Sequence, residues 1–262
     1  MPIGTKRIAK FNNDPKWQDL PLFLCPDLGY KREERLPKVD STALVLLSGG
    51  QDSTTCLAWA IDKFVKVEAV AFDYGQRHRH EIEAAKQIAT TAGIDLKVIP
   101  LGGLCGSALT DHTMEVSATG GMDDLPTTFT PGRNAVFLST ACGYAATRDI
   151  RHIVTGICQT DYSGYPDCRE DFREAMESAM SLALGREVYI HAPRMFIDKA
   201  ETVRMAMQLD ALHLVSMSLT CYDPQVAING GAYPCRACPA CLIRLRGFNN
   251  AGIKDPAPYA FS

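Results

Sequence analysis

Two groups of residues in this sequence have types and spacing that could do chemistry. In the first, two glycines and then Gln-Asp-Ser directly follow an apolar run. Glycines let the backbone turn sharply so that several N–H groups converge, and the start of a helix adds partial positive charge. Such a turn binds phosphate groups. The residues expected to form this nucleotide-phosphate site are Leu47, Ser48, Gly49, Gly50, Gln51, Asp52 and Ser53.

The spacing of this loop separates it from two common phosphate loops. It is neither Gly-x-x-x-x-Gly-Lys-[Ser/Thr] nor Gly-x-Gly-x-x-Gly. Ser-Gly-Gly-x-Asp-Ser after a first strand resembles the PP-loop ATP pyrophosphatases, and that resemblance implies transfer of AMP to an oxygen of a substrate. An ordinary helix N-cap turn is the alternative. Within the loop, Gln51 contributes through its backbone, whereas Asp52 either caps the helix or helps to hold Mg²⁺ between phosphates.

The second group is four cysteines near the C-terminus. Cys235-x-x-Cys238-x-x-Cys241, with Cys221 upstream, supplies four thiolates. Four thiolates favour tetrahedral Zn²⁺, and a site with no open position is structural. An iron–sulfur cluster or plain reduced thiols are the alternatives. Because the N-terminus carries no apolar core of signal-peptide length, we expect a cytoplasmic protein whose cysteines stay reduced.

Alternating strands and helices must position both groups. This alternation predicts an α/β fold with a doubly wound parallel five-stranded sheet. The resemblance of the loop implies that the sheet is PP-loop/HUP-like, and the four cysteines predict a small C-terminal zinc knot. The expected domains are an N-terminal extension (1–40), an ATP-binding domain (41–215) and a zinc-binding segment (216–262). The expected strands are 42–47, 67–72, 95–100, 150–156 and 188–191. The expected helices are 52–64, 80–92, 134–147, 171–184 and 199–210. A capping box from Asp198 to Glu201 begins the last helix.

Composition and charge exclude some classes of function. The 262 residues are 46% hydrophobic and 22% charged, as in an ordinary globular protein. A net charge of −3 gives no sign of a general affinity for nucleic acid or anionic membrane. The apolar run Ala43–Leu47 is far too short to span a bilayer. We therefore expect small-molecule partners, with no nucleic acid and no membrane.

Several further segments resemble one family, the 7-cyano-7-deazaguanine synthases (QueC) of queuosine biosynthesis. The resemblance covers about residues 42–256, and residues 1–40 have no counterpart in it. Its most restrictive parts are the Tyr165–Arg169 loop and the cysteine knot. The matching segments are Ser48–Thr55, Phe72–His78, Pro131–Asn134, Asp161–Arg169, Ser218–Tyr222 and Cys235–Phe248.

The resemblance implies a reaction. ATP drives 7-carboxy-7-deazaguanine and ammonia to the nitrile preQ0 through an adenylated carboxylate and an adenylated amide. A carboxylate oxygen is a poor leaving group, and adenylation lets it leave as AMP. The expected cofactors are one structural Zn²⁺ per chain and ATP with Mg²⁺ as co-substrate, and the expected assembly is a homodimer. Because no residues remain for a glutaminase domain, we expect free ammonium as the nitrogen source.

The resemblance also suggests roles for residues beyond the loop. Arg133 would stabilise charge on phosphorus or on the substrate carboxylate, with a surface ion pair as the alternative. Lys199 either reaches phosphates or is solvated. Asp161 or Asp167 would accept hydrogen bonds from a guanine-like base. The expected catalytic residues are Asp52, Ser53, Arg133 and Lys199; Phe72 and Asp73 would hold adenine and ribose; the expected substrate-binding residues are Gln76, His78, Asp161, Tyr165, Asp167 and Arg169.

Two rival functions differ in class. A PP-loop tRNA-modifying enzyme would need a basic face for RNA, and the net charge of −3 argues against one. A non-catalytic zinc-ribbon module with a decayed nucleotide site is the other rival, and the intact phosphate loop argues against it. Release of AMP and pyrophosphate only when the substrate is present distinguishes an enzyme from a binding module.

Overall fold

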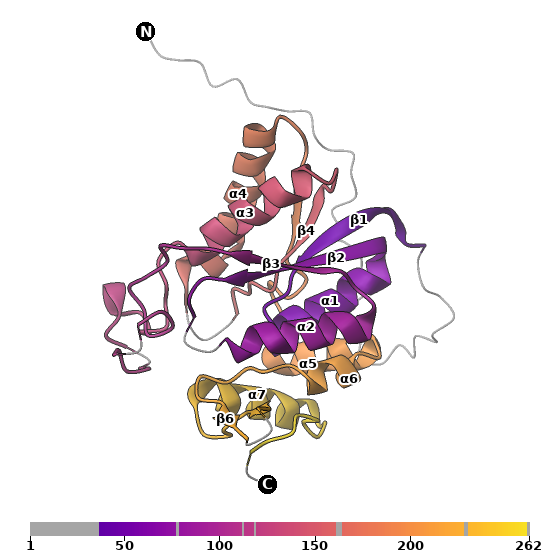
Figure 1. Ribbon diagram of the computed structural model, residues 1–262. Helices are drawn as coiled ribbons and strands as arrows, with labels where there is room; N and C mark the ends of the chain where they lie inside the picture. The colour runs from indigo at the N-terminus through magenta and orange to yellow at the C-terminus, as the bar shows by residue number, and fades with distance from the viewer. Residues whose placement is uncertain are drawn as a thin grey trace. The chain divides into compact units, whose positions relative to one another are not determined.

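The computed structural model describes residues 37–76, 79–111, 113–117, 119–160, 164–227 and 230–260. Residues 38–262 form one compact unit, built around a parallel sheet (Figure 1). The predicted extension over 1–40 lies almost wholly outside the described residues, as do His78 and Asp161. The division of the remaining chain at residue 215 stays a prediction.

The sheet has five strands in the order β3-β2-β1-β4-β5, and every neighbouring pair is parallel. This confirms the predicted doubly wound parallel sheet. The chain extends the sheet in one direction from β1 to β3 and then returns to the other side of β1 with β4. The strands are β1 (Val39–Leu46), β2 (Phe64–Asp73), β3 (Leu96–Pro100), β4 (His152–Val154) and β5 (Tyr189–His191).

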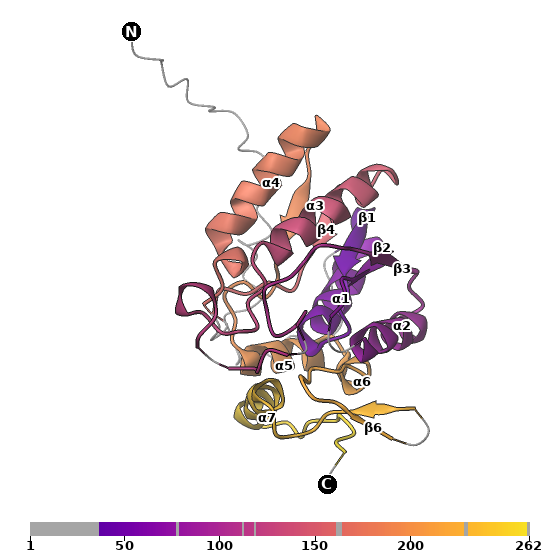
Figure 2. The same ribbon diagram turned by 60° about the vertical axis from the view of Figure 1, so that its left-hand side comes forward.

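Helices cover both faces of the sheet because successive residues of a strand point to opposite sides. Ala43 and Val45 of β1 belong to one apolar cluster, and Leu44 between them belongs to the other. Figures 1 and 2 show α3 and α4 on one face and the remaining sheet-covering helices on the other. The helices are α1 (Gln51–Lys63), α2 (His80–Ala92), α3 (Arg133–Ala146), α4 (Glu170–Leu184), α5 (Lys199–Gln208) and α6 (Leu212–Ser216).

The order of the strands determines where a ligand can bind. β1 is followed by β2 on one side, whereas its other neighbour, β4, comes much later in the chain. In open α/β sheets, ligands bind beyond the carboxyl ends of the strands where the strand order reverses. The turn 47–50 joins β1 to α1 at this point, so the phosphate loop lies where the topology favours a site.

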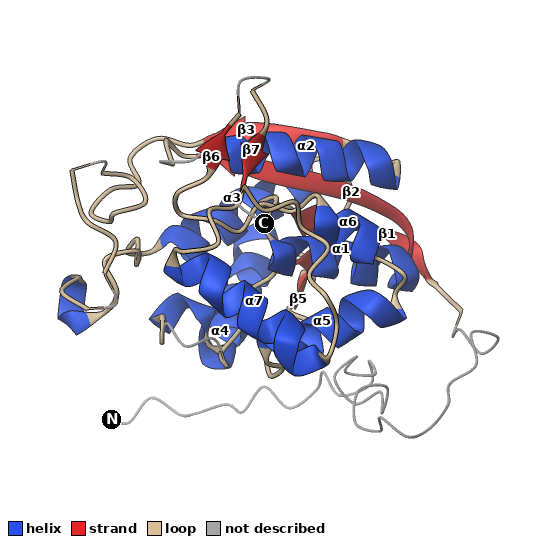
Figure 3. Cartoon of the chain, turned by 90° about the horizontal axis from the view of Figure 1, so that it is seen from below, coloured by secondary structure: helices blue, strands red, loops and turns tan. Residues whose placement is uncertain are grey.

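The C-terminal segment contains elements that the sequence did not predict. A two-stranded antiparallel hairpin, β6 (Gln225–Val226) and β7 (Ala232–Tyr233), precedes α7 (Pro239–Ala251). α7 packs against α5, and Figure 3 shows the two helices side by side. The contact is close: a Cβ on Gly247 of α7 would lie 2.8 Å from the Cβ of Lys199. The four-cysteine segment is therefore attached to the helices beside the phosphate loop.

Most predicted elements agree with the structure to within a few residues. The capping box of α5 is confirmed, because Asp198 accepts the Glu201 N–H at 2.8 Å and the Glu201 carboxylate accepts the Asp198 N–H at 2.7 Å. The segment between β3 and α3 contains a short 3₁₀ turn, Met122–Asp124. Among the described residues, no helix combines the length and apolar character needed to cross a membrane.

Candidate active site

The phosphate loop depends on a glycine at position 49. Gly49 has φ of +89°, in the left-handed region that glycine adopts without strain. A Cβ there would lie only 2.1 Å from the backbone oxygen of Glu81 and 2.9 Å from the backbone nitrogen of Ala85. The Gly49 carbonyl accepts the Leu219 N–H at 2.9 Å. The loop is thus packed between α2 and the chain after α6, with no space for a side chain.

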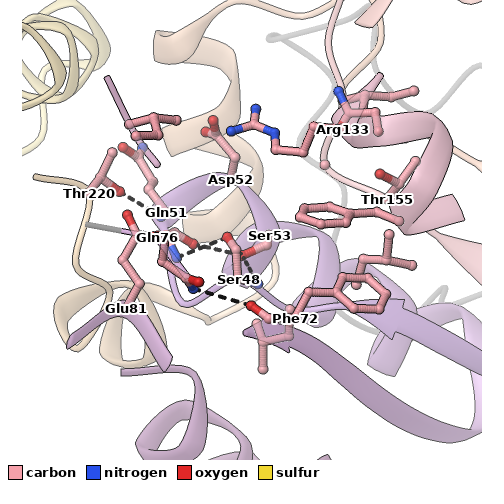
Figure 4. A pocket seen from close by; sticks show the side chains of 18 of the residues that line it. Ser48, Gln51, Asp52, Ser53, Phe72, Gln76, Glu81, Arg133, Thr155 and Thr220 are labelled. Atoms are coloured by element: carbon pink, nitrogen blue, oxygen red, sulfur yellow. Dashed lines mark hydrogen bonds between the residues drawn. The ribbon is translucent and has the colours of Figure 1, made fainter. Parts of the chain in front are cut away.

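Two serine hydroxyls close the loop on itself. The Ser53 hydroxyl donates to the Gly50 carbonyl at 3.1 Å and accepts the Ser48 N–H at 3.2 Å. The Ser48 and Ser53 hydroxyl oxygens lie 3.0 Å apart (Figure 4). The Gln51 N–H donates to the Thr220 hydroxyl at 2.9 Å. These bonds fix the backbone where the N–H groups at the start of α1 could bind an anion.

Asp52 does not cap α1. The N-cap residue of α1 is Gly50, and no side chain caps this helix. The interpretation of Asp52 as the helix cap is therefore wrong. Its carboxylate instead pairs with Lys199 Nζ at 2.6 Å and with an Arg194 nitrogen at 3.1 Å. Burial alone would raise the pKa of Asp52, but Arg194 and Lys199 lower it below its usual value. Lys199 is therefore paired at the site and is not a solvated lysine.

A cavity of about 380 Å³ opens in front of the phosphate loop. Phe72 and Phe137 form part of its wall, with ring centroids 4.6 Å apart and the rings stacked. Gln76 donates to the Phe72 carbonyl at 3.2 Å and accepts the Tyr74 N–H at 3.0 Å, which holds its side chain against the end of β2. The predicted site residues that line the cavity are Leu47, Ser48, Gly50, Gln51, Asp52, Ser53, Phe72, Gln76, Arg133, Tyr165 and Lys199.

Arg133 begins α3 and lines the cavity rather than forming a surface ion pair. Burial alone would lower the pKa of Arg133, but Tyr74 and Asp167 favour its charged form and raise the pKa. The guanidinium thus stays protonated in the cavity that the phosphate loop also lines. A cation in this position can stabilise negative charge that develops in the cavity.

Four of the described predicted site residues lie outside the cavity lining, namely Gly49, Asp73, Asp167 and Arg169. Asp73 forms an ion pair with Arg79 at 2.6 Å. The buried Asp167 accepts the Asn134 N–H at 3.1 Å and so stabilises the first turn of α3. Arg169 is exposed and is the N-cap residue of α4. Their proposed contacts with ribose or base remain predictions.

The four predicted metal ligands come together. The sulfur atoms of Cys221, Cys235, Cys238 and Cys241 all lie within 4.8 Å of one another. The Cys221–Cys238 and Cys235–Cys241 separations are 3.9 and 4.0 Å. Tetrahedral Zn²⁺ with Zn–S bonds of about 2.3 Å places its sulfurs about 3.8 Å apart, so the cluster fits this ion. Backbone N–H groups of Tyr222 and Asp223 donate to the sulfurs at 3.3 and 3.4 Å, which favours thiolates.

The sequence also matches known proteins along most of its length. Residues 42–252 match the family described as queuosine biosynthesis protein QueC. The 7-cyano-7-deazaguanine synthase of Chromobacterium violaceum is 50% identical over 83% of this chain and 93% of that protein. The protein of that name from Laribacter hongkongensis is 50% identical over 82% of this chain and 93% of its own. This chain belongs to the QueC family. Among solved structures, NMN synthetase from Francisella tularensis superposes with a TM-score of 0.41 at 14% identity, covering 67% of this chain and 64% of that one.

Within this QueC-family site, one residue that sequence reasoning missed is Arg194. Its side chain is fully buried. Besides Asp52, it binds the Gly156 carbonyl at 3.0 Å and the Thr202 hydroxyl at 3.1 Å. A single arginine between β5 and α5 carries no motif, and only the folded chain brings it to the phosphate loop. It holds Asp52 without itself lining the cavity.

Glu81 is the second missed residue of the QueC-family site. It lies in the first turn of α2, where an acidic residue is ordinarily a solvated partner of the helix dipole. Here it lines the cavity. Burial raises the pKa of Glu81 to about 7, and the nearby Arg133 only partly offsets that rise.

The raised pKa predicts how Glu81→Gln changes stability. An unfolded glutamate has a pKa of about 4.5, so between pH 4.5 and 7 the folded chain binds more protons than the unfolded one. The free energy of unfolding therefore falls as pH rises through this window. The glutamine side chain cannot ionise, so the variant should be about 1–3 kcal/mol more stable than the parent at pH 8 and equal to it near pH 4.5. Thermal unfolding at both pH values tests this, and an equal Tm at pH 8 would contradict it.

Proposed function

We propose that this chain catalyses the ATP-dependent conversion of 7-carboxy-7-deazaguanine and ammonia to 7-cyano-7-deazaguanine, in queuosine biosynthesis. The observation that carries the proposal is the phosphate loop, which opens directly onto a cavity lined by the cations Arg133 and Lys199. Relatives that carry the name of this enzyme are 50% identical over more than four fifths of the chain. The site has the parts that an adenylate-forming reaction needs.

The first activation uses the loop and its cations. The N–H groups around Gly50 bind the phosphates of ATP, and Lys199 and Arg133 offset their negative charge. A carboxylate oxygen of the substrate attacks the α-phosphorus, and the bond to the β-phosphate oxygen breaks. Pyrophosphate leaves with the electron pair, and an acyl-adenylate remains. Asp52 keeps Lys199 beside the loop before ATP binds.

Ammonia then attacks the acyl carbon, AMP leaves, and an amide forms. The amide oxygen is a poor leaving group in its turn, so a second ATP adenylates it at the same loop. Loss of AMP and of two protons from nitrogen gives the nitrile. One cavity can serve both steps because each needs the same contact between an oxygen nucleophile and the α-phosphorus.

The metal ions are part of the proposal. Mg²⁺ with ATP would be held mainly by the phosphates, because both carboxylate oxygens of Asp52 already contact cations. At the four cysteines we propose one structural Zn²⁺, which closes the C-terminal segment without taking part in the reaction. We further propose a homodimer, and a cytoplasmic location that keeps the thiols reduced.

Mass spectrometry of the products tests this function. With 7-carboxy-7-deazaguanine, ammonium and MgATP, the chain should form the nitrile and AMP, and without the carboxylate substrate it should form no AMP. Lys199→Met should lower AMP formation about 100-fold, because a cation is lost beside the transferred phosphate. The control is Lys86→Met, an exposed lysine on α2 that pairs with Glu83. AMP release that ignores the substrate, or an unaffected Lys199→Met variant, would refute the proposal.

A further inference from the structure

One carboxylate that lines the cavity has no partner among the residues that the structure describes. Of the described residues that line the cavity, only Asp52 and Glu81 carry carboxylates. Asp52 is balanced by Lys199 and Arg194. Within the described part of the chain, the Glu81 carboxylate makes neither a hydrogen bond nor an ion pair. Such a group is costly to keep charged in a cavity unless a cation or a proton joins it.

The surroundings of Glu81 suit a small donor-rich cation. Figure 4 shows Glu81 with Gln51, Gln76 and Thr220 on one side of the cavity and Arg133 on the other. Tyr74 and Tyr222 also line the cavity. The titratable groups that act on Glu81 are Arg133 of α3, Tyr74 after β2 and Tyr222 after α6. The hydroxyls and phenols that line the cavity with this carboxylate supply acceptors for N–H donors.

We propose that Glu81 binds the ammonium ion that supplies nitrogen and removes one of its protons. This inference rests on the proposed function. Ammonium has no lone pair and cannot attack carbon. Its proton passes to a carboxylate oxygen of Glu81, the freed lone pair forms the C–N bond, and the bond from the acyl carbon to the AMP oxygen breaks. AMP leaves with that electron pair, and the new amide nitrogen loses a second proton to water.

The position of Glu81 fits this role better than two others. A Mg²⁺ site draws on several oxygen ligands in octahedral geometry, and no second unpaired carboxylate lines the described cavity. A carboxylate that reads a guanine-like base must stay ionised. Burial instead raises the pKa of Glu81 to about 7, which favours a group that accepts and returns a proton near neutral pH. Its backbone oxygen also lies against Gly49, so the carboxylate is held beside the phosphate loop.

The test replaces Glu81 with glutamine and compares two nucleophiles. Hydroxylamine is mostly uncharged near pH 7 and needs no base to free its lone pair. With ammonium, Glu81→Gln should form amide about 100-fold more slowly than the parent chain. With hydroxylamine, hydroxamate and AMP formation should stay within about threefold of the parent, since adenylation is unchanged. The matched control is Glu83→Gln, an exposed glutamate of the same helix that pairs with Lys86.

The outcomes separate this inference from the proposed function. If the variant keeps full activity with ammonium, or if it loses activity equally with both nucleophiles, Glu81 is not the ammonium base. An equal loss would point to ATP, Mg²⁺ or base binding. If the parent chain makes no AMP with either nucleophile, the proposed function itself fails, and this inference with it.

Discussion

Replacing Gly49 with alanine should lower substrate-dependent AMP formation by about a thousandfold or more. The new Cβ would lie 2.1 Å from the Glu81 backbone oxygen, and that atom belongs to a helix that cannot yield like a flexible side chain. The loop must therefore move away from α2. In the proposed mechanism, the N–H groups around Gly50 would then no longer point at one phosphate, and the stabilisation that aligned dipoles give to a transition state would be lost. AMP release in the presence of carboxylate substrate and ammonium measures the effect.

A matched control separates the effect of the Cβ collision at position 49 from the effect of backbone strain at a positive φ. Gly93 caps α2 with φ of +68° and has nothing within 4 Å of a built Cβ. Gly93→Ala thus carries a similar conformational cost, about 1 kcal/mol, without the collision. It should lose stability but retain turnover. Ser53→Ala removes only the hydroxyl that closes the loop and gives a second measure if Gly49→Ala does not fold. Parent-like AMP formation in both loop variants would rule the loop out of the reaction.

The fold could be predicted because its signals are local and mutually consistent. Continuous apolar runs at the central strands mark burial on both faces, and the intervening helices have their own caps, such as Gly93 after α2 and the Asp198–Glu201 box before α5. The hairpin β6–β7 and α7 escaped prediction. The hairpin strands are two residues each, and the cysteine spacing predicts metal ligands but carries no signal for the helix α7.

The site was predictable only where its residues form a motif. The phosphate loop and the four cysteines are read from spacing within one segment. Only the fold brings Arg194 to Asp52 and Glu81 to the cavity, so the two residue types carry no signal in the sequence. For Asp52, the sequence predicts the position in the loop but not the residue with which it pairs. Its position in the loop was predicted, but its pairing with Lys199 crosses 147 residues and could not be derived.

The cysteine cluster is linked to the cavity through the backbone between them. Thr220, which accepts the Gln51 N–H, and Tyr222, which lines the cavity, flank Cys221 on either side. Arg244 of α7 adds a second link, since it binds the Ser218 carbonyl and hydroxyl and pairs with Asp255 while fully buried. A metal at the cluster would therefore hold two cavity contacts in place as well as the C-terminal fold.

Cys238→Ser should therefore cost both metal and stability. Folding and binding are coupled at structural zinc sites, where the ion contributes on the order of 10 kcal/mol in small domains, so losing one thiolate should release most of the Zn²⁺ and lower Tm by about 10 °C or more. The KM for ATP should rise because Thr220 and Tyr222 lose their anchor. Metal analysis and calorimetry measure the Zn²⁺ content and the Tm, with Cys105→Ser as the exposed-cysteine control.

A variant that keeps one Zn²⁺ per chain and the parent Tm would show that Cys238 is not a ligand. Loss of the metal with an unchanged KM for ATP would show that the link to the cavity carries no function.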